Sequence, residues 1–146
     1  MLELVTNLFS RKVGSLEKFI EIVKSKNYSA VVVRSYATYK SGYMKWGTGP
    51  IGTYHYMLEY TVTTPSGRKK ILYKEELSER FGSHRGYPRG NDLRDATIEH
   101  LLLSEVKVGE LQEQLPSVQV SLMRSEDEPV DYDKLHKDAE AYGISL

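Results

Sequence analysis

The chain has 146 residues, 40% of them apolar, and contains no cysteine. This length and composition fit one folded domain with a buried core, and the missing cysteine excludes disulfides, thiolate metal sites and a thiol nucleophile. No apolar run approaches the roughly eighteen residues of a membrane span, and the short apolar start, interrupted by Glu3, is unlike a secretory signal. We therefore expect a single cytoplasmic domain over residues 1–146, with no membrane partner.

The formal net charge is zero, but the charges are unevenly distributed along the chain. Residues 1–90 hold 15 Lys and Arg against 7 Asp and Glu, so 15 − 7 = +8, and residues 91–146 hold 5 against 13, so 5 − 13 = −8. A basic part within a neutral chain indicates an anionic partner. The alternative is that the basic and acidic parts neutralise each other by packing, within one chain or between two subunits.

The first predicted element is a helix in residues 15–27. Ser15 is a suitable N-cap, and Asn27 is a suitable end. Its apolar residues recur at i, i+3, i+4 and i+7, which places them on one helix face: Leu16, Phe19, Ile20 and Val23. Residues 29–39 follow, rich in β-branched and aromatic side chains, and this composition predicts a strand.

A β-hairpin is predicted in residues 53–74. Residues 53–63, TYHYMLEYTVT, alternate in polarity, which is typical of a half-buried antiparallel strand. One face carries Tyr54, Tyr56, Leu58, Tyr60 and Val62, and the other carries His55, Met57, Glu59 and Thr61. The TPSG sequence at residues 64–67 predicts a type I turn, after which residues 68–74 return as the partner strand.

The predicted elements become helical after this hairpin. Residues 75–82, EELSERFG, predict a short helix, and the glycines and proline of residues 83–90 predict a loop. Asn91 or Asp92 is expected to cap the next helix, which starts at residues 93–105. Three successive leucines make the middle of that helix apolar on more than one side, so we expect it to be buried or to lie at an interface.

The last third of the chain predicts three more elements. The helical pattern weakens at residues 106–109, so residues 110–115 are expected to form a separate helical piece that Pro116 ends. Residues 117–123 alternate like a strand, and residues 131–143 form an amphipathic helix with a glycine past its end. The predicted order is α-β-β-β-α-β-α, an α+β fold with helices packed on a mostly antiparallel sheet.

Residues 47–52, GTGPIG, contain the spacing G-x-G-x-x-G. A dinucleotide-binding fold needs this motif between a strand and a helix, whereas here a predicted strand follows it. A protein-kinase glycine loop does join two strands, but the other kinase motifs are absent from the sequence. We interpret the segment as a flexible connection between strands, to which Tyr43 and Trp46 add aromatic surface.

Residues 80–90, RFGSHRGYPRG, form a basic segment with three arginines. Guanidinium groups bind phosphates, and Tyr or His stacks on exposed bases. The preceding predicted strand begins with a second basic group, in which Arg68 and Lys70 point the same way. The predicted nucleic-acid-binding residues are Arg68, Lys70, Arg80, His84, Arg85, Tyr87 and Arg89. The pattern does not separate DNA from RNA, and the alternative is a solvated loop with scattered charges.

Two resemblances also point to nucleic acid. The α-β-β-β-α order of residues 15–105 is similar to that of a double-stranded RNA-binding domain. That family begins its second helix with a lysine cluster, whereas the matching RGNDLRDA sequence here has no lysine. Residues 108–124 resemble a helix-turn-helix, in which Gln119, Ser121 and Arg124 would face bases. The Val-x-Val alternation in the same residues favours a strand.

Asp92, Asp95 and Glu99 follow one another at i, i+3 and i+7, beside His100. Carboxylates on one helix face can bind a divalent metal, although acids in the first turns of a helix also suit its dipole. His84 and His100 are the candidates for general acid–base chemistry.

The sequence therefore favours a non-enzymatic binding module whose basic part meets nucleic acid, with no cofactor and no metal. One alternative is a homodimeric interaction domain, in which the many tyrosines would line the interface. The other is a metal-dependent nuclease or phosphoesterase.

Overall fold

The structure is a computed structural model that describes residues 13–43, 50–81, 90–124 and 128–146, with side chains described for residues 13–39, 53–79, 93–124 and 128–146. The elements are α2 (Leu16–Ser25), β1 (Ala30–Tyr43), β2 (Pro50–Thr63), β3 (Lys69–Phe81), α3 (Gly90–Gln114), β4 (Gln119–Arg124) and α4 (Tyr132–Ala141). The α+β class and the order α-β-β-β-α-β-α are confirmed.

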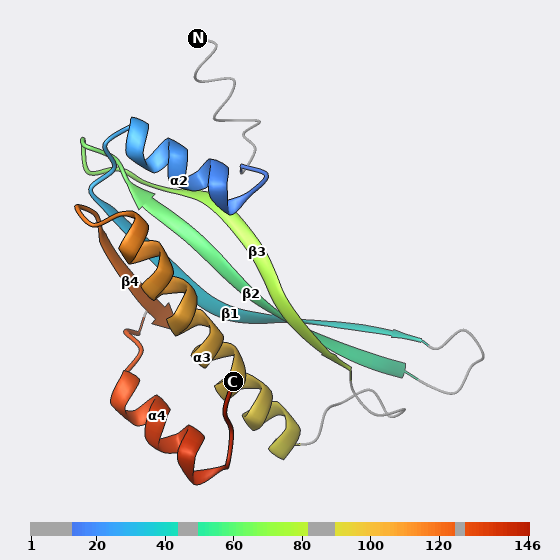
Figure 1. Cartoon of the computed structure of the whole chain (residues 1–146). Helices are drawn as coiled ribbons and strands as arrows, with labels where there is room; N and C mark the ends of the chain where they lie inside the picture. Colours follow the sequence, from blue (N-terminus) through green and yellow to red (C-terminus); the bar gives the residue numbers. More distant parts are fainter. Residues whose placement is uncertain (1–12, 44–49, 82–89, 125–127) are drawn as a thin grey trace.

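The four strands form one mixed sheet in the order β3-β2-β1-β4. β1 pairs antiparallel with β2, and β2 pairs antiparallel with β3. β4 instead runs parallel to β1, because the long helix α3 carries the chain back across the sheet between β3 and β4 (Figure 1). The sheet is thus mostly antiparallel, as expected, with one parallel pair that the sequence did not predict.

One face of the sheet is covered by α2 and α3, and we call it the covered face (Figure 1). The alternation predicted for β2 is confirmed, because Leu58, Tyr60 and Val62 are buried against these helices. The main core also takes in residues of the other elements: Phe19, Ile20, Val23, Tyr28, Val31, Val33, Val108, Leu111, Leu115, Val118 and Leu122. The opposite face, which carries His55, Met57, Glu59 and Thr61, meets no described helix, and we call it the open face.

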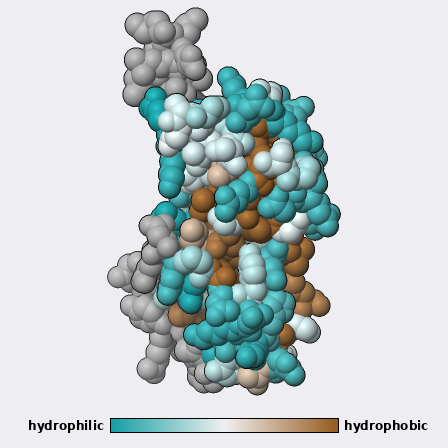
Figure 2. Space-filling model, turned by 90° about the vertical axis from the view of Figure 1, so that its left-hand side faces the viewer, coloured by the Kyte–Doolittle hydropathy of each residue, from teal (hydrophilic) through white to brown (hydrophobic). Residues whose placement is uncertain are grey.

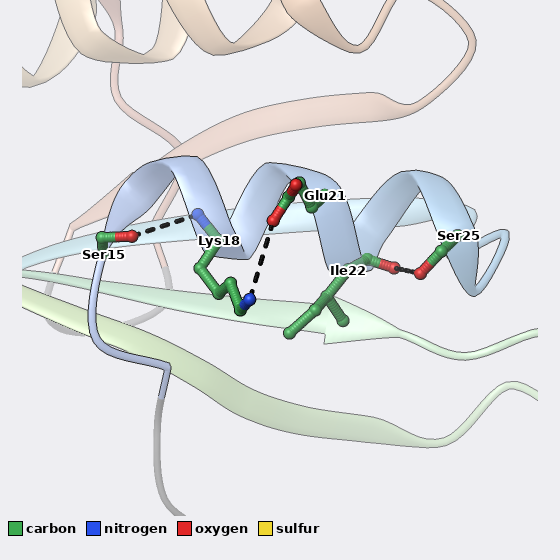
Figure 3. Close-up of polar contacts among 5 residues, drawn as sticks. All are labelled: Ser15, Lys18, Glu21, Ile22 and Ser25. Atoms are coloured by element: carbon green, nitrogen blue, oxygen red, sulfur yellow. Dashed lines mark hydrogen bonds and ion pairs between the residues drawn. The ribbon is translucent and has the colours of Figure 1, made fainter.

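The capping of α2 agrees with the sequence (Figure 3). The Oγ atom of Ser15 accepts a hydrogen bond from the backbone N–H of Lys18 at 3.1 Å, which satisfies one of the helix's unpaired N-terminal donors. Asn27 follows the last turn with a φ of 55°, in the left-handed conformation common after helix ends. The hydroxyl of Ser25 donates a hydrogen bond to the carbonyl of Ile22 at 3.2 Å.

The α3 helix is continuous over 25 residues, so the predicted break at residues 106–109 is wrong. Val108, Leu111 and Leu115 stay in register with the sheet, and this packing outweighs the low helix propensity of Gly109. The predicted caps are also wrong, because the helix begins at Gly90 and includes residues 91 and 92.

A second side of α3 packs on α4, as the apolar middle of the predicted helix required. Ile98, Leu101 and Leu102 contact Leu135 and Ala139 in a smaller apolar cluster. The helix therefore lies between the sheet and α4, which explains why its apolar residues are not confined to one stripe.

The predicted helix at residues 75–82 is wrong, because residues 75–81 continue β3 beside β2. Glutamate-rich sequence favours a helix locally, but the long strand β2 offers a row of backbone partners that only a strand can use. The pairing is irregular between Tyr56 and Met57 and again between Tyr60 and Thr61. At each irregularity β3 contributes one extra residue, a β-bulge at Leu77 and at Leu72.

The resemblance to a helix-turn-helix does not hold, because residues 119–124 form β4. Val118 and Leu122 are buried in the main core, as the alternating pattern predicted. Gln119, Ser121 and Arg124 therefore lie on an edge strand, where they form no recognition helix. Seen from the side of β4, apolar residues emerge as a band between hydrophilic surfaces (Figure 2).

No helix in the described part of the chain is long and apolar enough to cross a membrane.

Candidate functional sites

Two basic segments leave the sheet at the same end. Tyr43 is opposite Pro50 where β1 and β2 end, and Phe81 is opposite Thr53, three residues from that end. Residues 40–52 and 80–91 together contain Lys40, Lys45, Arg80, Arg85 and Arg89 and no Asp or Glu. The topology therefore anchors two acid-free segments, distant in sequence, to one end of the sheet.

Several predicted binding residues lie outside the described residues: His84, Arg85, Tyr87 and Arg89. The backbone of Arg80 pairs with Tyr54 near the end of β3, but its side chain is not described. The rings of Tyr39 and Tyr54 are in contact on the neighbouring strands, with centroids 4.8 Å apart. Described aromatic surface thus lies beside the point where the basic segment 80–91 begins.

Arg68 and Lys70 lie at the other end of the sheet, beside the β2–β3 turn. Ten residues of β3 separate Lys70 from Arg80, a span of roughly 30 Å at the usual rise of a strand. The ammonium of Lys70 stands 5.7 Å from the ring centre of Tyr28. The predicted residues therefore do not form one compact patch, and only an extended polyanion would reach both groups.

Within the described residues, the predicted carboxylate set on α3 forms no cluster that could hold a metal. Asp95 forms an ion pair with Arg94, whose Nη2 is 2.9 Å from Oδ1, and the side chain of Asp92 is not described. The guanidinium of Arg94 also stacks on the ring of Tyr142 at 3.7 Å. His100 belongs to a different face of the helix and packs against the sheet.

His100 is buried between α3 and β2, with 2% of its surface exposed. Its ring lies 5.1 Å from the ring of Tyr56, and neither ring nitrogen forms a hydrogen bond within the described part of the chain. Loss of water lowers the pKa of His100 to about 4, and the nearby backbone of Met57 opposes this shift only in part. The imidazole is therefore neutral near pH 7.

A small cavity of about 80 Å³ adjoins His100, and its wall includes Ser35, Tyr56, Thr97 and Arg124. The hydroxyl of Thr97 donates to the carbonyl of Leu93 at 2.8 Å, so the Tyr56 hydroxyl, 3.3 Å away, donates to Thr97. The cavity combines a buried imidazole, hydroxyl groups and one cation.

A larger groove of about 690 Å³ lies between α3, α4 and the segment that joins β4 to α4. It shares Thr97, Leu101 and Arg124 with the small cavity. A volume of this size is typical of sites for small organic ligands. Sequence reasoning did not bring these residues together, because they come from three elements that only the fold brings together.

A cluster of one histidine and two glutamates lies on the open face. The Nδ1 atom of His55 is 2.5 Å from Oε1 of Glu76 and 3.6 Å from Oε2 of Glu79. Residues three apart on a regular strand point to opposite faces, but the bulge at Leu77 puts Glu76 and Glu79 on the same face. Sequence reasoning missed this cluster because it expected residues 75–82 to be a helix.

The covered face holds a different carboxylate, Glu75. It accepts hydrogen bonds from the hydroxyl of Tyr60 at 2.5 Å and from the Nζ of Lys107 at 2.8 Å. Burial and the adjacent carboxylate raise the pKa of Tyr60 above its ordinary value. This network links β2, β3 and α3, so its role is structural.

Comparison with known proteins finds no match among protein-family models, curated proteins or solved structures.

Proposed function

We propose that this protein is a nucleic-acid-binding domain that uses the end of the sheet where residues 40–52 and 80–91 are anchored. The observation that supports this proposal is the convergence of two basic, acid-free segments at one end of a rigid sheet. A phosphate backbone attracts such a concentration of Lys and Arg and is not repelled by any carboxylate within the two segments.

The roles of the residues follow from their chemistry. Arg80, Arg85 and Arg89 bind phosphate oxygens, because a guanidinium group matches them with two parallel donors. Tyr87 and His84 stack on exposed bases.

The helical layer carries the opposite charge. Among the described side chains of residues 93–146, 5 Lys and Arg stand against 10 Asp and Glu, so 5 − 10 = −5. This layer repels the phosphate backbone and restricts binding to the basic end of the sheet.

Binding of labelled single- and double-stranded DNA and RNA at two salt concentrations tests the proposal. Because phosphate contacts release counterions, affinity falls steeply as salt rises. Arg85→Ala with Arg89→Ala removes two contacts, so the slope of log affinity against log salt falls by about 2. Lys134→Ala with Lys137→Ala removes the same charge from α4 and leaves binding unchanged. Failure of every probe to bind at low salt contradicts the proposal.

A second candidate function is a metal-dependent nuclease or phosphoesterase, and the His55, Glu76 and Glu79 cluster favours it. Imidazole nitrogens and carboxylate oxygens are ligands for divalent transition metals. Glu79 lies two residues before the end of β3. A metal at this cluster would therefore lie near the end of β3 that leads into the basic segment 80–91, and it would activate a water molecule there.

Cleavage assays separate this candidate from simple binding. The same probes are incubated with Mg²⁺, Mn²⁺ or Zn²⁺ and run on a denaturing gel. The nuclease is supported by metal-dependent cleavage that Glu76→Gln with Glu79→Gln abolishes while binding is kept. The matched control is Glu59→Gln, because Glu59 lies on the same face but pairs with Lys74 at 3.4 Å. Intact probes with every metal contradict the nuclease and leave the binding proposal standing.

A further inference from the structure

The small cavity at His100 and the groove between α3 and α4 adjoin each other, because Thr97, Leu101 and Arg124 line both. The cavity is the deep polar end, against the covered face of the sheet. The groove is the wider outer part, with a volume of about 690 Å³. Residues of α3, β4 and α4 line the groove, and residues of β1 and β2 complete the cavity.

The deep end contains the imidazole of His100, which lies near the backbone of Met57 but has no well-formed hydrogen bond among the described residues. Both ring nitrogens of His100 are buried and make no hydrogen bond within the described residues, although buried polar groups in native proteins nearly always have a partner. A cavity of about 80 Å³ beside the ring leaves room for a polar group from outside the chain or for water. A neutral imidazole offers one donor and one acceptor to such a group.

The outer part has an apolar wall and a charged group. The apolar lining of the groove comes from Leu93, Ile98 and Leu101 of α3 and from Val130 and Leu135. Arg124 lies where the groove meets the cavity, and its guanidinium forms no ion pair with any described residue. Three carboxylates also line the groove, those of Glu128, Asp131 and Asp138. The carboxylate of Asp131 caps α4 by accepting from the N–H of Lys134 at 3.1 Å.

We propose that this site binds a small organic carboxylate with an aromatic or hydrocarbon body. The apolar body lies against Leu93, Ile98 and Leu135, where it displaces water from apolar surface. The carboxylate binds Arg124, for which a guanidinium is the best-matched side chain. One carboxylate oxygen accepts a hydrogen bond from His100, which provides the partner that the ring lacks. The ligand thereby contacts Arg124 and His100 at once.

A matched pair of probes, 4-phenylbutyrate and 4-phenylbutanol, tests the charge requirement. The two molecules share an apolar body and differ in the carboxylate. Titration of the isotope-labelled protein is followed by NMR, with the ring nitrogens of His100 and the Nε of Arg124 as reporters. We expect saturable shifts of both reporters with the carboxylate, and at least tenfold weaker binding of the alcohol, since a charge-assisted hydrogen bond is lost.

Two variants locate the site. Arg124→Gln is expected to weaken the carboxylate at least tenfold and to leave the alcohol unchanged, whereas Lys137→Gln, on an exposed part of α4 outside the groove, changes neither. His100→Phe fills the cavity and reduces binding of the carboxylate, and its thermal melt verifies that the variant is folded. The inference is overturned if the two probes bind equally, if Arg124→Gln has no effect, or if His100 responds to no probe and its cavity holds only water.

Discussion

The same residue type has different surroundings on the two faces of the sheet. His55 and Tyr56 are neighbours in β2, so they point to opposite faces. On the open face, His55 meets the carboxylates of Glu76 and Glu79 in contact with water. On the covered face, Tyr56 packs on His100, a buried histidine whose ring nitrogens form no hydrogen bond within the described residues. The comparison shows that burial, more than residue type, sets the chemistry of a histidine here.

Glu75 and Glu76, which are neighbours on β3, also lie on opposite faces of the sheet. Glu75 is turned inward and joins Tyr60 and Lys107, while Glu76 is turned outward and joins His55. Removing a buried carboxylate leaves its donors unpaired, whereas water replaces an exposed one. The covered face therefore carries the stability of the fold, and the open face has polar groups available for ligands.

The largest difference between the faces is expected for two adjacent residues, Leu58 and Met57. Leu58→Ala removes a fully buried side chain from the main core and should cost about 3 kcal/mol of unfolding free energy. Met57→Ala, on the open face, should cost about 1 kcal/mol or less. Urea denaturation followed by circular dichroism measures both. Equal losses would show that another layer covers the open face.

The next largest difference in unfolding free energy is expected between substitutions of Glu75 and Glu76. Glu75→Ala leaves the Tyr60 hydroxyl and the Lys107 ammonium without their acceptor, at a cost of about 2 to 3 kcal/mol. Glu76→Ala removes only a half-exposed ion pair with His55 and should cost about 0.5 kcal/mol. The same denaturation experiment compares them, and a larger loss for Glu76→Ala would reverse the assigned roles of the two faces.

The buried histidine predicts a pH effect. The pKa of His100 falls from 6.5 to about 4 on folding, so below pH 6.5 the unfolded chain binds a proton that the folded chain does not. Stability present above pH 6.5 is lost as the pH falls toward 4, by about 2 kcal/mol between pH 7 and pH 5.

His100→Leu isolates this contribution, because all other titrating groups are shared by the two proteins. The free energy of unfolding is measured for both proteins at pH 7, 6 and 5. The variant should lose about 2 kcal/mol less than the wild type over this range. Parallel pH curves would mean that His100 is protonated in the folded chain.

The smallest expected effect concerns the helix that covers the sheet. Ser15→Ala removes the side-chain cap of α2 and should cost about 1 kcal/mol. Ser15→Asp keeps an acceptor at the same position and should restore most of that loss. Thermal unfolding of the three proteins tests this, and an unchanged melting temperature for Ser15→Ala would show that the cap contributes nothing to the covered face.

Local sequence determined the elements whose signals lie within one turn or one strand. The capped, one-sided pattern of residues 15–27 specifies α2, and the strict alternation of residues 53–63 specifies β2 and the face that it buries. The turn at residues 64–67 is likewise local, since the carbonyl of Thr64 accepts from the N–H of Gly67 at 2.9 Å. Each of these features depends on side-chain spacing and backbone preferences that a short stretch contains by itself.

Only the tertiary structure decided the rest. Residues 75–81 favour a helix locally but form a strand because β2 provides their hydrogen-bond partners, and the bulge at Leu77 then creates the cluster around His55. The continuity of α3, the parallel pairing of β4 and the unpaired state of His100 depend in the same way on residues distant in sequence. The binding role of His84, Arg85, Tyr87 and Arg89 stays a sequence prediction. Periodicity reports which side of an element is apolar, but which element covers that side is settled by packing alone.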